Sequence, residues 1–123
     1  MLRNAALGLG LLASAMAPLA AQGDVSDEAL LQRRLRACLT AGAPGAPRDS
    51  LASAVAALRS LCYTQFRRLR ELRLREVDAP FGLPNKTLSR DEQEQLGHAR
   101  DRATRQLDGE IALAISNFTG LTQ

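Results

Sequence analysis

Apolar residues recur at helical spacing along three segments of the chain. In each segment they return every three or four residues, which places them on one face of an α-helix, whereas a half-buried strand would alternate apolar and polar residues. The three faces contain Leu31, Leu35 and Cys38; Leu51, Val55, Leu58, Cys62, Phe66 and Leu69; and Leu96, Ala99, Ala103, Leu107, Ile111, Ala114 and Phe118. We therefore predict helices over 26–41, 50–77 and 89–118.

Residues at the ends of these segments support the same boundaries. The starting residues are good N-caps, because their side chains can accept a hydrogen bond from a backbone N–H of the first turn. They are Asp24 or Ser26, Asp49 or Ser50, and Ser89, which forms a capping-box pattern with Glu92. Gly42 and Gly120 are typical helix terminators, and Pro80 stops the second helix. The Pro- and Gly-containing stretches 42–49 and 80–88 are predicted loops.

The third predicted helix contains two glycines, Gly97 and Gly109. A glycine inside a helix costs about 1 kcal/mol relative to alanine. We expect their missing side chains to let a neighbouring element approach this helix.

The first 21 residues have the order of regions found in a secretory signal peptide. Arg3 supplies an early positive charge, an uncharged run rich in Ala, Leu and Gly follows, and Pro18 and small residues close the stretch. We predict cleavage after Ala21. The alternative sites are Ala20 and Ala17. An uncleaved membrane anchor is less favoured, because the apolar run of about 17 residues is short of the roughly 20 that span a bilayer.

The predicted mature domain, residues 22–123, is then a periplasmic or secreted protein of bacterial type, with no transmembrane segment after cleavage. It contains the chain's two cysteines, Cys38 and Cys62. Outside the cytoplasm two such thiols usually pair, and the resulting disulfide should stabilise the domain by about 3 kcal/mol. A redox pair or a catalytic thiol is the alternative, but the spacing is not Cys-x-x-Cys and no His lies nearby in the sequence.

We predict an all-α fold in which three helices lie antiparallel, two long ones forming a hairpin beside a shorter N-terminal one. Placing Cys38 level with Cys62 brings the apolar faces of the first two helices together. Folding the third helix back near Pro84 then pairs its apolar face with that of the second. The separate local patterns agree with one arrangement, which favours it.

The strongest charge feature is the arginine-rich run 67–75. One interpretation is an anion-binding face formed by Arg67, Arg70, Arg73 and Leu74, which would meet anionic lipid or another envelope polymer. The other interpretation is intramolecular pairing with acidic residues of the neighbouring helices and within the run. Without Arg3 the formal net charge falls from +3 to +2, which is too balanced for a nucleic-acid binder.

Candidate catalytic and metal-binding residues are few. His98 is the single histidine, and no spacing of His, Cys and carboxylates supplies the three or four ligands of a zinc site. Asp91, Glu92 and Glu94 are explained by the favourable field at a helix N-terminus. We therefore predict no enzyme activity, no cofactor and no metal.

The sequence favours a protein-interaction module, such as an adaptor, an inhibitor or a chaperone-like protein, with a cationic envelope-surface binder as the alternative. In the predicted register, one end of the bundle lies beyond the first helix, and only the loop 42–49 can shield it. We expect an apolar surface there, formed by Leu51, Val55, Ile115 and Phe118, that serves self-association or binding of an unknown protein partner.

Overall fold

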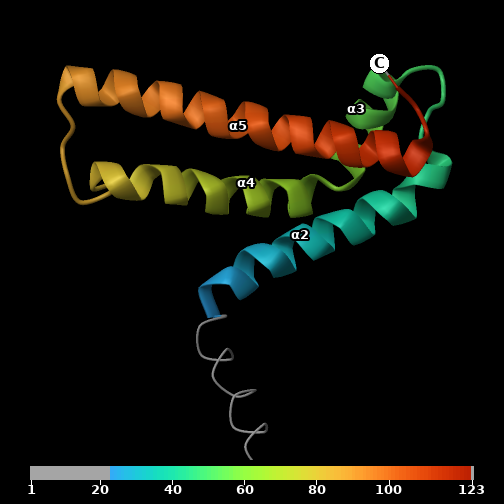
Figure 1. Ribbon diagram of the computed structural model, residues 1–123, viewed down its shortest axis with the longest axis horizontal. Helices are drawn as coiled ribbons and strands as arrows, with labels where there is room; N and C mark the ends of the chain where they lie inside the picture. The colour runs from blue at the N-terminus through green and yellow to red at the C-terminus, as the bar shows by residue number, and fades with distance from the viewer. Residues whose placement is uncertain (1–22, 123) are drawn as a thin grey trace, which may run out of the picture.

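The computed structural model describes residues 23–122, with side chains from Asp27 onward, and every regular element in this range is helical (Figure 1). The elements are α2 (Gly23–Gly42), the 3₁₀ turn η2 (Ala43–Gly45), α3 (Leu51–Leu61), α4 (Tyr63–Asp78), the 3₁₀ turn η3 (Ala79–Phe81) and α5 (Arg90–Thr119). The predicted all-α class is confirmed. The predicted signal peptide, residues 1–21, lies outside the described residues.

The predicted helix 50–77 is wrong in one respect, because the chain forms two helices there, α3 and α4. They are separated at Cys62, whose backbone has φ −101° and ψ 27°. The Cys62 N–H still donates to the Leu58 carbonyl at 2.9 Å, and the Cys62 carbonyl accepts from the Phe66 N–H at 3.0 Å. Hydrogen bonding is therefore kept on both sides while the helix axis changes direction (Figure 1).

Within residues 23–122, the bend replaces the predicted three-helix arrangement with four helices. α4 and α5 lie side by side as an antiparallel hairpin, and α2 crosses α4 obliquely (Figure 1). α3 turns away from the line of α4 and contacts both α2 and α5. Its buried residues Leu51, Ala54 and Leu58 thereby close the end of the core, and this burial of apolar surface explains the bend.

Helix capping follows the sequence closely at α3 and α5. The Ser50 Oγ accepts a hydrogen bond from the Ser53 N–H at 3.0 Å. The predicted capping box is confirmed: the Ser89 Oγ accepts from the Glu92 N–H at 3.2 Å, and the Glu92 Oε1 accepts from the Ser89 N–H at 3.1 Å. α5 ends at Gly120, whose φ of 76° lies in the left-handed region that glycine tolerates.

The start of α2 differs from the prediction. α2 is already helical at Gly23, the first residue that the structure describes, so Asp24 and Ser26 lie within the helix and neither is its N-cap. The described helix therefore includes at least three residues before the predicted start at Ser26.

Gly42, rather than Gly97 or Gly109, is approached closely by side chains of another helix. A Cβ at Gly42 would lie 2.6 Å from the Leu61 Cδ2 and 2.8 Å from the Leu58 Cδ2. A Cβ at Gly97 or Gly109 would meet nothing within 4 Å, so the expected close approach at those two positions is wrong. The end of α2 therefore packs closely against α3.

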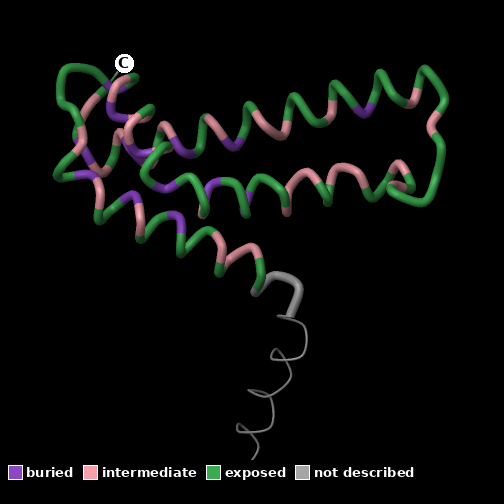
Figure 2. Tube along the Cα trace, turned by 180° about the vertical axis from the view of Figure 1, so that it is seen from behind, coloured by how far each residue is buried: buried purple, intermediate pink, exposed green. Residues whose placement is uncertain are grey.

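The hydrophobic core lies at one end of the hairpin, where α2 and α3 meet it. Figure 2 shows the buried residues gathered there, while the far end of the hairpin is mostly exposed or half-buried. The cluster comprises Leu35, Leu39, Leu51, Ala54, Leu58, Cys62, Phe66, Leu69, Leu107, Ile111 and Ile115.

The predicted disulfide between Cys38 and Cys62 is confirmed, with an S–S distance of 2.02 Å and a Cα–Cα distance of 5.9 Å. Cys62 is fully buried and Cys38 is half-buried. The bond joins α2 to the corner between α3 and α4, so it holds together the elements that enclose the core.

Candidate functional site: a groove between α2 and α5

A groove of about 530 Å³ runs between α2 and α5. Its floor consists of residues that also belong to the core or pack against it. These are Leu35, Leu39, Leu69, Leu107, Ile111 and Ala114. The rim is mostly polar, and consists of Ala29, Gln32, Arg33, Arg36, Arg73, Glu110, Leu113 and Asn117. Apart from Ala114, these floor residues are only 2–5% exposed, so the apolar residues of the groove with appreciable exposure are Ala29, Leu113 and Ala114.

Leu113 stands on the α5 rim of the groove with 64% of its surface exposed. It lies two residues from the buried Ile111, and at 100° per residue this places it outside the apolar face of α5. An exposed leucine next to an apolar groove extends the apolar surface that a ligand would contact.

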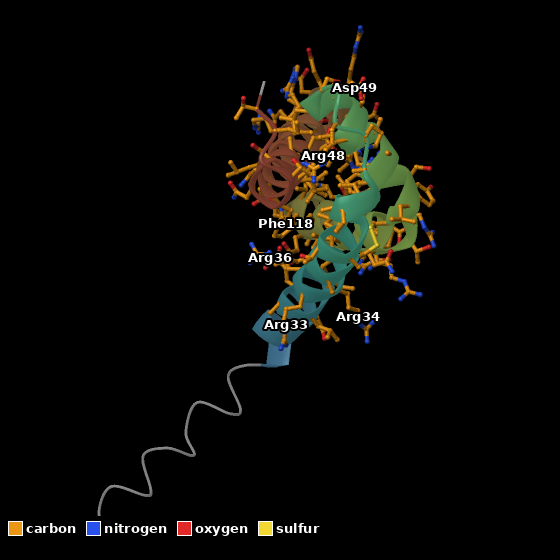
Figure 3. The ribbon with its side chains drawn as sticks, turned by 90° about the vertical axis from the view of Figure 1, so that its right-hand side faces the viewer. Arg33, Arg34, Arg36, Arg48, Asp49 and Phe118 are labelled. Carbon is orange, nitrogen blue, oxygen red and sulfur yellow. A yellow bond between two sulfur atoms is a disulfide. The ribbon has the colours of Figure 1, made fainter. Side chains whose placement is uncertain are left out.

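Arg33 and Arg36 supply positive charge on the α2 rim. They are three residues apart, so they are neighbours on the helix surface, and both are exposed. Among the side chains described, neither has an ion-pair partner within 4 Å. Arg36 projects on the α5 side of α2, whereas Arg34 projects on the opposite side (Figure 3).

Arg73 closes the groove and is already neutralised. Its Nε donates to the Glu28 Oε1 at 3.0 Å and its Nη1 donates to a Glu110 carboxylate oxygen, so it links α4 to both α2 and α5. Burial lowers the pKa of Arg73, but the hydrogen bonds and charges of Glu110 and Glu28 outweigh it and raise this pKa overall. The unpaired charge of the rim is therefore that of Arg33 and Arg36.

The structure divides the predicted anion-binding face. Arg67 and Arg70 are exposed and Leu74 is half-buried, but Arg67 already forms an ion pair of 3.1 Å with Glu71 on its own helix. Arg73 points to the groove and binds acidic residues of two other helices, so it is not part of the same surface. The contact with Glu28 confirms the intramolecular interpretation for this one arginine.

The predicted apolar partner surface is largely covered. Ile115 is fully buried and Leu51 is 8% exposed, so the expectation that they form an exposed surface is wrong. Val55 and Phe118 are half-buried against the core. The bend at Cys62 tilts α3 over this end of the bundle.

The segments next to this end supply the rest of the cover. Ala43 is buried, and Ala46 and Leu121 pack against the core cluster. In the same loop, Arg48 donates from its Nη1 to the Thr119 carbonyl at 3.4 Å (Figure 3). The sequence suggested that the loop 42–49 alone covers this end of the bundle. Residues that follow α5 cover it as well.

Polar contacts outside the groove hold helices and helix ends in place. The Arg59 Nη2 lies 3.4 Å from the Asp108 Oδ1, and its guanidinium stacks 4.5 Å from the centre of the Phe66 ring. The contact between Arg59 and Asp108 is an ion pair, and the buried Asp108 Oδ1 accepts no hydrogen bond from the described residues. Arg59 therefore ties α3 to α4 and α5.

Two carboxyl groups with lowered pKa values lie at the far end of the hairpin. The Lys86 Nζ donates to Glu92 at 2.9 Å, and this bond, together with the capping bonds of Ser89, lowers the pKa of Glu92 to about 2. Arg100 donates two hydrogen bonds to Asp78, at 2.7 and 2.8 Å, and lowers its pKa. Both shifts are explained by contacts that fix the hairpin and its helix ends.

Sequence reasoning missed the three most informative groove residues, Arg33, Arg36 and Leu113. The signals were present, since all three interrupt or flank the apolar face of their helix. The longer arginine run 67–75 is the stronger charge feature of the sequence. In residues 23–122 no group of three or more His, Cys, Asp and Glu side chains is placed to hold a metal ion. In the same range no helix is long and apolar enough to cross a bilayer.

Comparisons of the chain with protein-family models, with curated proteins and with solved structures found no match. The groove is therefore interpreted from its own geometry and charge.

Proposed function

We propose that this chain is an exported, non-enzymatic protein-interaction module whose binding site is the groove between α2 and α5. In this proposal residues 1–21 are removed as a signal peptide, and the domain acts in the bacterial periplasm or outside the cell. The observation that carries the proposal is an apolar groove floor beside an exposed leucine and two arginines that have no ion-pair partner among the described side chains.

The composition of the groove supports binding rather than catalysis. The described residues that line it carry no hydroxyl, thiol or imidazole group that could act as a nucleophile or a proton-transfer group. Its one carboxylate, that of Glu110, is bound to Arg73. Small apolar grooves with a polar rim are typical of surfaces that accept a side or an end of another protein.

Site-specific photo-cross-linking tests this proposal. Benzoylphenylalanine placed at Leu113 should cross-link a partner protein in the envelope fraction of the native host. The matched control is Leu61, which is equally exposed, at 64%, and lies on α3 away from the groove. Adducts at Leu113 and none at Leu61 are expected, and equal labelling at both positions or none at Leu113 would overturn the proposal.

The same experiment checks export. The intact mass of the protein recovered from the envelope fraction should correspond to residues 22–123 with one disulfide. A protein that is found only in the cytoplasm with residues 1–21 attached would contradict the export part of the proposal.

A further inference from the structure

We infer that the groove between α2 and α5 receives an acidic amphipathic helix of the partner protein. This inference rests on the proposed function and adds the chemistry and the shape of the occupant. It follows from the length of the groove, from its apolar floor and from the sign of the charge on its α2 rim.

The dimensions of the groove fit a helix. The lining residues run from Ala29 to Leu39 on α2 and from Leu107 to Asn117 on α5. Each wall therefore covers ten helical steps, or about 15 Å at 1.5 Å per residue, which matches about three turns of an added helix. Extended peptides bind by adding a strand to a sheet edge or, as polyproline segments, in grooves lined by aromatic side chains. The described part of the chain contains no strand, and no aromatic residue lines this groove.

The charge of the rim selects an acidic occupant. Arg33 and Arg36 lie one turn apart on the α2 wall without ion-pair partners among the described side chains, and both guanidinium groups are exposed. Carboxylates spaced three or four residues apart on a bound helix would meet both of them. On the α5 wall Glu110 is paired with Arg73, which it shares with Glu28, so these three side chains carry one net negative charge against the two positive charges of Arg33 and Arg36.

The apolar floor indicates that the face of the bound helix that enters the groove is apolar. Ile111 and Leu107 lie in the floor and Leu113 stands on the α5 rim. A helix whose leucines recur at three and four residues would place them on this floor while its carboxylates face α2. A basic helix of the same apolar pattern would bring its positive charges against Arg33 and Arg36.

Binding of two designed peptides to the mature, disulfide-bonded protein tests the inference. Both are fluorescein-labelled 14-residue helices with the same leucine face, one with glutamates and the other with lysines on the flank. Fluorescence anisotropy at low salt should show that the acidic peptide binds at least tenfold more tightly than the basic one. Amide shifts in NMR spectra should place the bound acidic peptide over Leu107 and Ile111. Equal affinities, or shifts elsewhere, would overturn the inference.

Charge reversals on α2 provide the matched variants. Arg33→Glu/Arg36→Glu should weaken binding of the acidic peptide at least tenfold and strengthen binding of the basic one. Arg34→Glu, on the same helix but facing away from the groove, should leave both affinities within twofold. Both sites are exposed, so circular dichroism should show both variants folded. A loss of affinity with Arg34→Glu equal to that of the double variant would contradict the assignment.

The cross-linked partner separates failure of this inference from failure of the proposed function. If benzoylphenylalanine at Leu113 captures a segment that is basic or has no helical apolar pattern, the inference fails while the interaction module stands. If nothing is captured and neither peptide binds, the proposed function fails as well. A concentration-dependent dimer that Leu113→Asp abolishes would show that a second copy, not an acidic helix, occupies the groove.

Discussion

Replacing Gly42 with alanine tests the close contact between α2 and α3, which exists only because the chain bends at Cys62. The new Cβ would lie 2.6 Å from the Leu61 Cδ2 and 2.8 Å from the Leu58 Cδ2. Leu61 is 64% exposed and can move aside, but Leu58 is 1% exposed and is held by the core. The variant therefore overpacks a buried site.

The expected loss can be worked out from opposing effects. Overpacking a core typically costs about 1–3 kcal/mol. Alanine in place of glycine within a helix returns up to about 1 kcal/mol, and less at a helix end such as this one. We expect Gly42→Ala to lower the free energy of unfolding by about 1–2 kcal/mol. Gly97→Ala and Gly109→Ala enter open space, so each should raise it by about 0.5–1 kcal/mol.

Urea unfolding followed by circular dichroism at 222 nm, with the disulfide intact, measures all three variants under the same conditions. With an m-value of about 1–2 kcal/mol/M, the midpoint should fall by about 1 M for Gly42→Ala and rise by about 0.5 M for each control. Adding Leu61→Ala to Gly42→Ala removes the shorter contact and should recover part of the loss.

A stabilising Gly42→Ala would refute this reasoning. In a straight helix over 50–77, Gly42 would not meet Leu58 and Leu61 at these distances, and alanine there would behave like the two exposed controls. The sign of the change at Gly42 therefore distinguishes the bent arrangement from the straight one.

Two further predictions concern the covalent link and the start of α5. Reduction of the Cys38–Cys62 bond, which spans 24 residues, should lower the free energy of unfolding by about 3.5 kcal/mol, as measured by urea titration with and without reductant; an unchanged midpoint would be the contrary result. Because the folded-state pKa of Glu92 is lowered to about 2, its stabilising contribution is present above about pH 4.5 and is lost as the pH falls through 2. The stability advantage over Glu92→Gln should therefore shrink between pH 5 and 2, and an NMR titration giving Glu92 a pKa near 4.5 would contradict this.

The features of this fold that depend on local interactions can be predicted from the sequence. Ser50 and Ser89 cap their helices as predicted, and Gly120 ends the last one, because each of these features involves residues within a few positions of one another. The cysteine pair follows from count and predicted compartment alone. None of these features requires knowledge of how the helices pack.

The bend at Cys62 shows where local reasoning stops. The sequence around it, Leu61-Cys62-Tyr63, contains neither Pro nor Gly, and the apolar spacing continues without interruption from Leu51 to Leu69. A bend that keeps the backbone hydrogen bonds on either side costs little free energy locally. The chain therefore bends because the bend buries α3 against α2 and α5. The bend also buries Leu51, which the predicted straight helix over 50–77 would leave uncovered.

By itself, the sequence determined the helical class, most helix ends and the disulfide, because these depend on side-chain periodicity, capping and a single pair of thiols. The packing of the helices, which the sequence does not show, pairs Arg73 with two glutamates and leaves Arg33 and Arg36 with no ion-pair partner among the described side chains. The physical reason is that charge pairing and exposure depend on how far α2 stands from α5, and this distance results from packing between residues remote in the chain.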